Sequence, residues 1–531
     1  MTEPESSPSL RPGDADGFAG RRAKIIAAAA CVLIPLAALH FFFVRDLTDQ
    51  LGDALAHMEG ARRIFDSLTP GYPEIGTVWL PLYHILVAPL AQINYLWRTG
   101  LAGSLVSITA FGITGYLLFL LATAMNRSSA AGALALAGLL LCPNMLYLAS
   151  TPLTEPLTLL WSVATVYTLY QFQQTGRRRF LIDAACAAFL GTLTRYDGWY
   201  LLPFAAVFVL LASPAPWRAR FRNTIIFSAI AGFGPVLWFA HNAYRFGNVL
   251  AFYNGRFSAR AIYAREIALT GFHYPTAGHI VLSLRYLLED MRLVIGPGPI
   301  ELAVLGLVVW AADSAMRSRR SAALLFLVPL PFYVQAMAFA AIPLYVPTLF
   351  PYTYYNLRYG LEMIPAIALF PSFALSWRLG SRVRAGLLAA FLAVIAAQGF
   401  AIIRQGPKHL DLVRESVNDN PCRSERQAVV IEFLRKHYDG RPLLMALGNW
   451  PCVAPTLDIP YRRIYTEANR AYWRQMKSDP ENYVGWIVAR TGDPVDELMR
   501  SYPRAFARFK RVGWWPLGHG ESVAIFRRAA G

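Results

Sequence analysis

Long apolar runs dominate the first 400 residues and are separated by short polar segments. Because a helix needs about 20 apolar residues to cross a hydrocarbon core of about 30 Å, each run predicts a transmembrane helix. About eleven spans are expected, at residues 25–44, 100–125, 130–149, 155–172, 180–194, 199–212, 224–243, 299–315, 321–342, 359–377 and 385–403. The pattern therefore predicts an α-helical polytopic membrane protein.

Residues 404–531 have a different pattern and predict a small α/β domain. The expected elements are a helix at 425–437 and strands at 443–447, 484–488 and 522–526. Cys422 and Cys452 both fall in this domain, where a disulfide is permitted if the domain lies outside the cytoplasm. The sequence leaves this pairing open, because it gives no distance between the two thiols.

Composition excludes a water-soluble enzyme. Hydrophobic residues make up 55% of the chain and charged residues 16%, against about 25% charged residues in soluble domains. The formal net charge of +17 would suggest nucleic-acid binding in a soluble protein. Here most of the chain is not soluble, so no nucleic-acid partner is expected.

The basic residues instead predict the orientation in the membrane, because Lys and Arg are retained on the cytoplasmic side. Every second connection is basic; these connections carry Arg127, Arg177 to Arg179, Arg218, Arg220, Arg222, Arg317, Arg319, Arg320, Arg378, Arg382 and Arg384. Residues 1–24 are then expected to be a disordered cytoplasmic tail, and residues 25–403 a transmembrane domain with outside loops at 45–99 and 244–298. The α/β domain, residues 404–531, is expected outside the plasma (inner) membrane.

An acidic segment follows the first span. Asp46, Asp49, Asp53 and His57 are three, four and four residues apart, so a helix would place them on one face. Such a stripe can hold a carboxylate as a general base toward a hydroxyl group. The alternative is that Asp46 or Asp49 caps the helix and the others form a solvated face. Metal binding by Asp49, Asp53 and His57 lacks a fourth ligand; no metal site is assigned, and a divalent cation is left open.

The next segment, residues 74–94, contains Trp79, Tyr83 and His84. Counting it as a span would break the basic-loop pattern, so it predicts an amphipathic helix in the membrane interface, with Trp79 and Tyr83 at headgroup depth. His84 is either a structural histidine or a substrate-binding one.

Ionisable residues also occur at the expected outside ends of later spans. These are Glu155, Arg195, Asp197 and Arg358, the last followed by Tyr359. Ionisable side chains at membrane depth usually face a polar cavity or a partner. Arg195 and Asp197 can pair with each other, whereas Glu155 and Arg358 have no partner nearby in the sequence. A guanidinium group at this depth suits a phosphate, because its N–H fork matches the oxygens.

In these motifs the chain resembles the GT-C superfamily of integral-membrane glycosyltransferases, in particular the protein O-mannosyltransferase and aminoarabinose-transferase-like branch (glycosyltransferase family 39-like). The motifs are Asp53-x-x-x-His57, Trp79 to His84, Leu153 to Pro156, Leu193 to Trp199 and Asn356-x-Arg358-Tyr359. The resemblance implies that Asp53 is the catalytic base, that Glu155 is the second acidic position and that the donor is a sugar on a polyprenyl phosphate. Relatives often have two adjacent acids at the first site, but Ala54 follows Asp53 here, so Asp49 is a rival or a helper.

The sequence therefore predicts an inverting hexosyl or pentosyl transferase that moves a mannose-like or similar sugar to a glycan, lipid or protein hydroxyl. Asp53, Asp49 and Glu155 are the expected catalytic residues. The expected substrate-binding residues are His57, His84, Arg195, Asp197, Arg358 and Tyr359. The alternative is a transporter or flippase of a polyprenyl-linked saccharide or another anionic lipid, which would place polar residues deep within several spans.

Overall fold

The computed structural model describes residues 20–376, 379–518 and 520–529. Residues 1–19 of the expected tail and Arg378 lie outside these ranges. The chain forms two compact units that do not follow chain order. We call them the helical unit, with residues up to 45, 77–83 and 106–415, and the mixed unit, with residues 46–76, 84–105 and 416 onward.

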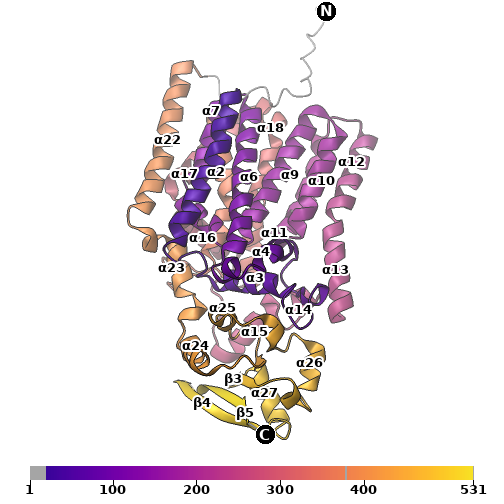
Figure 1. Cartoon of the computed structure of the whole chain (residues 1–531). Coiled ribbons are helices and arrows are strands. Elements are labelled where there is room, and N and C mark those ends of the chain that lie inside the picture. Colours follow the sequence, from indigo (N-terminus) through magenta and orange to yellow (C-terminus); the bar gives the residue numbers. More distant parts are fainter. Residues whose placement is uncertain (1–19, 377–378, 519, 530–531) are drawn as a thin grey trace, which may run out of the picture. The chain divides into compact units, whose positions relative to one another are not determined.

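Long apolar helices build the helical unit (Figure 1). Its first helices are α2 (Arg21–Phe43), α6 (Leu101–Asn126), α7 (Ser129–Leu140), α8 (Pro143–Ala149), α9 (Glu155–Thr175), α10 (Arg178–Thr192), α11 (Tyr196–Ala212), α12 (Trp217–Ala231) and α13 (Phe233–Phe246). The later ones are α17 (Pro297–Ala312), α18 (Ser314–Arg319), η2 (Ser321–Leu327), α19 (Pro329–Ala338), η3 (Leu357–Met363), α20 (Ile364–Leu369), α21 (Pro371–Ala374) and α22 (Ser381–Ile403).

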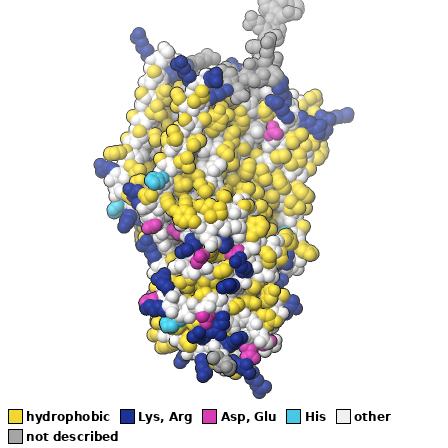
Figure 2. All heavy atoms as spheres, in the orientation of Figure 1, with side chains coloured by type: hydrophobic (Ala, Val, Ile, Leu, Met, Phe, Trp, Pro, Cys, Tyr) yellow, Lys and Arg dark blue, Asp and Glu magenta, His cyan; other side chains and the backbone are white. Residues whose placement is uncertain are grey.

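Helical structure overlaps every expected span. By length and composition, five helices of the described residues can cross a membrane, or up to seven if each bent pair is one span. The expected number of about eleven is therefore not confirmed. Apolar side chains also cover much of the visible face of these helices, as Figure 2 shows, and Ile26 and Leu33 on α2 are 68% and 65% exposed. An apolar surface of this kind fits lipid contact and indicates a membrane protein.

Proline and glycine explain the breaks and the close contacts between helices. The pair α7 and α8 bends by 71° where Pro143 begins the second helix, because proline cannot continue an i to i−4 hydrogen-bond ladder. Gly306 on α17 lies so near α20 and α21 that an added Cβ atom would be 1.9 Å from the carbonyl oxygen of Phe370. The α17 crossing therefore requires glycine at position 306.

The expected outside loop at 244–298 is not a plain loop. It contains α14 (Ala251–Asn254), α15 (Ala259–Thr270) and α16 (Ile280–Val294). The Ser258 side chain caps α15 by accepting a hydrogen bond from the backbone N–H of Ala261. The helix α16 packs against α19 and η3 and so becomes part of the core of the helical unit.

The mixed unit contains α3 (Gly52–Arg63), η1 (Tyr72–Glu74), most of α4 (Leu82–Ala91), α5 (Asn94–Arg98) and a five-stranded sheet. The strands are β1 (Leu443–Met445), β2 (Ile464–Tyr465), β3 (Trp486–Arg490), β4 (Phe509–Gly518) and β5 (Glu521–Arg528). Their order is β2-β1-β3-β5-β4, with β1 parallel to β2 and β3, and β5 antiparallel to β3 and β4.

The structure confirms the expected C-terminal helix as α24 (Glu425–His437) and the three expected strands as β1, β3 and β5. It also joins Cys422 to Cys452 in a disulfide, which the sequence left open. The strand β4 escaped prediction because it is an edge strand containing glycine and proline, which weaken the strand pattern, and its pairing with β5 shifts register near Pro516.

Candidate functional site

Glu155 and Arg195 lie at the starts of two neighbouring helices of the helical unit. Glu155 is the first residue of α9, and Arg195 directly precedes α11 in an extended conformation. Nη1 of Arg195 donates hydrogen bonds to Oε1 of Glu155 at 2.9 Å and to Oγ1 of Thr154 at 3.0 Å. This contact brings together two of the polar residues expected at span ends.

Arg358 reaches the same carboxylate from η3. Its Nε atom lies 3.0 Å from Oε1 of Glu155. The Glu155 side chain is only 1% exposed, whereas the Arg358 and Arg195 side chains are 9% and 19% exposed. One buried carboxylate therefore holds two guanidinium groups, of which Arg195 is the more accessible.

Asp197 and two tyrosines complete this arrangement. Oδ2 of Asp197 accepts hydrogen bonds from Nε of Arg195 at 3.4 Å and from the hydroxyl of Tyr333 at 3.1 Å. The rings of Tyr333 and Tyr359 stack at 4.8 Å, and the guanidinium groups of Arg195 and Arg358 lie 5.9 and 5.6 Å from the Tyr359 ring centre. We call Glu155, Arg195, Asp197, Tyr333, Arg358 and Tyr359 the arginine cluster.

The cluster refines what the sequence suggested about these residues. Arg195 and Asp197 do pair, but the shorter contact of Arg195 is with Glu155. Glu155 and Arg358, which have no partner nearby in the sequence, are partners of each other. Sequence reasoning missed Tyr333, because a tyrosine within an apolar run gives no signal of a polar contact.

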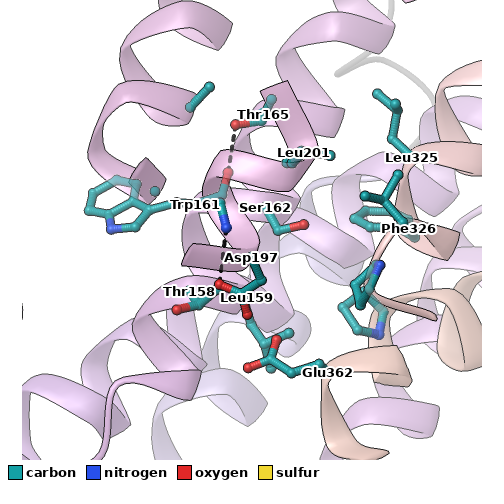
Figure 3. Close-up of a pocket in the computed structure, with 16 residues that line it drawn as sticks. Thr158, Leu159, Trp161, Ser162, Thr165, Asp197, Leu201, Leu325, Phe326 and Glu362 are labelled. Carbon is teal, nitrogen blue, oxygen red and sulfur yellow. Dashed lines mark hydrogen bonds between the residues drawn. The ribbon is translucent and has the colours of Figure 1, made fainter. Parts of the chain in front are cut away.

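A third carboxylate, Glu362, lies next to the arginine cluster. It is 3% exposed, and its Oε1 atom has no hydrogen-bond partner among the described residues. Glu362 and Asp197 line a cavity of about 30 Å³ between α9, α11, η2 and η3, with room for about two water molecules. Figure 3 shows the two carboxylates at one end of this cavity and Leu325 toward the other.

The structure corrects the acidic stripe expected after the first span. Helix α3 begins only at Gly52, so Asp46 and Asp49 precede it, and four residues cannot share one helix face. The chain turns at Asp46, which has a φ of 54°, a conformation that aspartate tolerates better than most residues. Leu51 occupies the N-cap position without a side-chain cap, so capping by Asp46 or Asp49 is also wrong. Only Asp53 and His57 lie on α3.

His57 and His84 form a pair in the mixed unit. Nδ1 of His57 lies 2.9 Å from Nε2 of His84, and His57 is 5% exposed. One ring must donate and the other accept, so at least one of these nitrogens carries no proton. The two histidines, both expected to bind substrate, thus form one hydrogen-bonded pair.

The expected interfacial helix is shorter than its apolar run. Helix α4 begins at Leu82, so Trp79 precedes it and is 39% exposed. Tyr83 is fully buried, and its hydroxyl lies 3.1 Å from Oγ of Ser107. The Tyr83 side chain therefore packs within the helical unit, and its position at headgroup depth stays a prediction.

Asp49 lines a cleft of about 670 Å³ within the mixed unit. Glu59, Trp97, Arg98 and Tyr461 line the same cleft. Burial raises the pKa of Asp49, although hydrogen bonds from its own backbone and from Gln50 oppose the shift. Burial also raises the pKa of Glu59. Carboxyl groups with raised pKa values in a cleft of this size are typical of a binding or catalytic site.

The described residues contain no group of three or more His, Cys, Asp or Glu side chains arranged to hold a metal ion. Asp49, Asp53 and His57, which the sequence allowed as metal ligands, therefore do not form such a group.

The fold and the buried ionisable cluster are those of a helical protein with several apolar helices long enough to cross a membrane. No protein-family model matches the sequence, and no curated protein sequence matches it. Among solved structures, ArnT from Cupriavidus metallidurans bound to undecaprenyl phosphate is similar, with a TM-score of 0.56 and 13% identity over 96% of this chain and 98% of that chain.

The apo state of the same ArnT gives a TM-score of 0.53 and 15% identity over 94% of this chain and 98% of that chain. An Archaeoglobus fulgidus oligosaccharyltransferase tethered with an acceptor peptide gives a TM-score of 0.42 and 11% identity, over 96% of this chain and 74% of that chain. The ArnT similarity extends over nearly the whole chain, which confirms the GT-C resemblance at the level of the fold.

Proposed function

We propose that this protein is a glycosyltransferase that moves a hexose or pentose from a polyprenyl-phosphate donor to an acceptor hydroxyl. The main support for this proposal is a fold that 96% of this chain shares with an ArnT structure bound to undecaprenyl phosphate. A fold alone does not define a reaction. The arginine cluster and the acidic residues of the mixed unit supply the chemistry that this reaction needs.

The donor phosphate is assigned to Arg195 and Arg358. A guanidinium fork matches phosphate oxygens and keeps its charge at all physiological pH values. Arg195 is the more exposed of the two, and it shares the Glu155 oxygen with Arg358. Glu155 thus holds both cations in place, and the phosphate would accept hydrogen bonds from the same groups as it leaves.

The acceptor hydroxyl is assigned to the mixed unit, with Asp53 as the general base and Asp49 as its rival. A carboxylate accepts the hydroxyl proton while the acceptor oxygen attacks the anomeric carbon, and the polyprenyl phosphate leaves from the opposite side. This single displacement inverts the anomeric centre. The reaction is proposed to take place on the outer face of the plasma membrane.

Asp49 has support that Asp53 lacks, because it lines the 670 Å³ cleft and has a raised pKa. Asp53 has the motif match and lies one helical turn before His57 on α3. The His57–His84 pair is proposed to bind substrate hydroxyl groups, since the two rings together offer both a donor and an acceptor.

The test uses purified protein in liposomes that contain polyprenyl-phosphate sugars and candidate acceptors. A glycosyltransferase cleaves the sugar–phosphate bond, so free polyprenyl phosphate and a glycosylated acceptor are expected to appear together. Movement of the intact donor between leaflets without cleavage would support the flippase alternative and contradict the proposal.

A further inference from the structure

Two buried carboxylates outside the arginine cluster hold the segment that carries Arg358. Glu415, from α23 (Asp411–Asn418), accepts hydrogen bonds from the backbone N–H of Asn356 at 2.5 Å and of Leu357 at 2.9 Å, one with each oxygen. Asp290, from α16, accepts one from the backbone N–H of Gly360 at 2.8 Å. Both acids lie in the helical unit with that segment.

The segment needs such partners because of its backbone conformation. Asn356 has left-handed dihedral angles, with φ 60° and ψ 29°, and directly precedes η3. The first N–H groups of a helical segment have no partner within it, and they favour negative charge. Glu415 accepts from two of these groups, those of Asn356 and Leu357, and Asp290 accepts from the N–H of Gly360 further along η3. The two residues between those groups are Arg358 and Tyr359.

The burial of both acids indicates a specific use. Glu415 is 3% exposed and Asp290 is 0% exposed, and burying a carboxylate is costly unless hydrogen bonds compensate. Oδ1 of Asp290 has no hydrogen-bond partner among the described residues. The contact also requires glycine, because a Cβ atom on Gly360 would lie 2.8 Å from Oδ2 of Asp290.

We infer that Glu415 and Asp290 are positioning residues that fix Arg358 and Tyr359 for recognition of a phosphate group through the backbone of residues 356–360. This inference rests on the proposed function, in which Arg358 binds the donor phosphate. Neither acid touches the substrate. Their role is to keep the Arg358 guanidinium 3.0 Å from Glu155 and the Tyr359 ring stacked on Tyr333, since a small displacement of a binding group can cost much of its effect.

The experiment measures binding of undecaprenyl phosphate to the full chain in nanodiscs. The set is wild type, Glu415→Gln, Arg358→Lys and the double variant. Glutamine keeps only one acceptor oxygen, so Glu415→Gln is expected to weaken binding roughly tenfold. In the Arg358→Lys background it is expected to cause almost no further loss, because the group that it positions is already altered. Glu301→Gln, an exposed acid of the helical unit, is the matched control and should bind normally.

A purely structural role would give equal losses in both backgrounds, and that additive result overturns the inference. Hydrogen exchange of residues 356–363 supplies a readout that needs no ligand: Glu415→Gln and Asp290→Asn should speed exchange there. Faster exchange with wild-type affinity would also overturn it. Gly360→Ala serves as a second variant, with weakened binding expected.

Failure of the proposed function gives a different pattern. If Arg358 does not bind the donor phosphate, wild-type protein would not bind undecaprenyl phosphate, while the exchange changes at residues 356–363 would persist. That result would leave the backbone contacts intact as structure and reject their role in phosphate recognition. If the protein is a flippase, binding and its dependence on Glu415 would remain, and only sugar transfer would be absent.

Discussion

Oε1 of Glu155 lies 3.0 Å from Nε of Arg358, so the first residue of α9 is ion-paired with η3. The same oxygen accepts a hydrogen bond from Arg195. Because Glu155 is 1% exposed, the pair is shielded from water and salt. Glu155 therefore holds the guanidinium groups of Arg195 and Arg358 close together.

Glu155→Gln is expected to destabilise the protein by about 3–5 kcal/mol, because removing one partner of a buried ion pair leaves the other charges uncompensated. Thermal denaturation in detergent measures this as a lower melting temperature. Glu432→Gln is the control: Glu432 pairs with Lys436 on the exposed surface of α24, and its loss should leave the melting temperature unchanged. Equal stability of Glu155→Gln and wild type would show that the pair does not hold the fold.

Gly306→Ala is expected to disrupt the helical unit, because the new Cβ atom would lie 1.9 Å from the carbonyl oxygen of Phe370. The backbone of α17 would have to move away from α20 and α21. Gly386→Ala on α22 is the matched control, since a Cβ atom there meets nothing within 4 Å. Size-exclusion profiles and melting temperatures of both variants test the crossing, and normal behaviour of Gly306→Ala would contradict it.

Asp439 is expected to make the mixed unit sensitive to acid. Burial alone would raise the pKa of Asp439, but hydrogen bonds from Arg441, Trp486 and Arg527 outweigh it and hold the pKa below its usual value of 3.8. The folded state therefore binds this proton less readily than the unfolded chain. The resulting stability is complete above the unfolded pKa and is lost as pH falls through the folded pKa.

Melting temperatures of the full chain, measured from neutral pH to about pH 2, test whether stability falls as the pH is lowered. Asp439→Asn should melt lower than wild type at neutral pH and should lose less stability on acidification. A parallel decline of the two proteins would exclude Asp439 as a source of acid sensitivity.

Local patterns in the sequence predicted those elements whose signals are local. The helix at 425–437 and the strand β3 have clear periodicity or apolar runs. Helices also overlap every apolar run, although only five to seven spans qualify by length and composition among the described residues. The acidic stripe failed because spacing cannot show where a helix begins, and α3 begins after Asp49. The strand β4 was missed because its glycines and proline resemble a turn.

Some residues of the candidate site could be predicted from the sequence, and others could not. Glu155, Arg195 and Arg358 were found because charged residues beside apolar spans are conspicuous. Their mutual contacts, however, join segments far apart in the chain. Glu415 and Asp290 were missed because they occur in ordinary polar stretches, and only their burial against backbone N–H groups reveals a role.

Sugar transfer with Asp53 as the general base is tested most directly in liposomes. Transfer of radiolabelled sugar from a polyprenyl phosphate is compared between Asp53→Asn and wild type. Asp458→Asn, an exposed aspartate of the mixed unit, is the control. Loss of transfer is expected for Asp53→Asn, together with normal folding and normal activity of the control. Undiminished transfer by Asp53→Asn would contradict its role as the base, and loss in Asp49→Asn alone would reassign that role to Asp49.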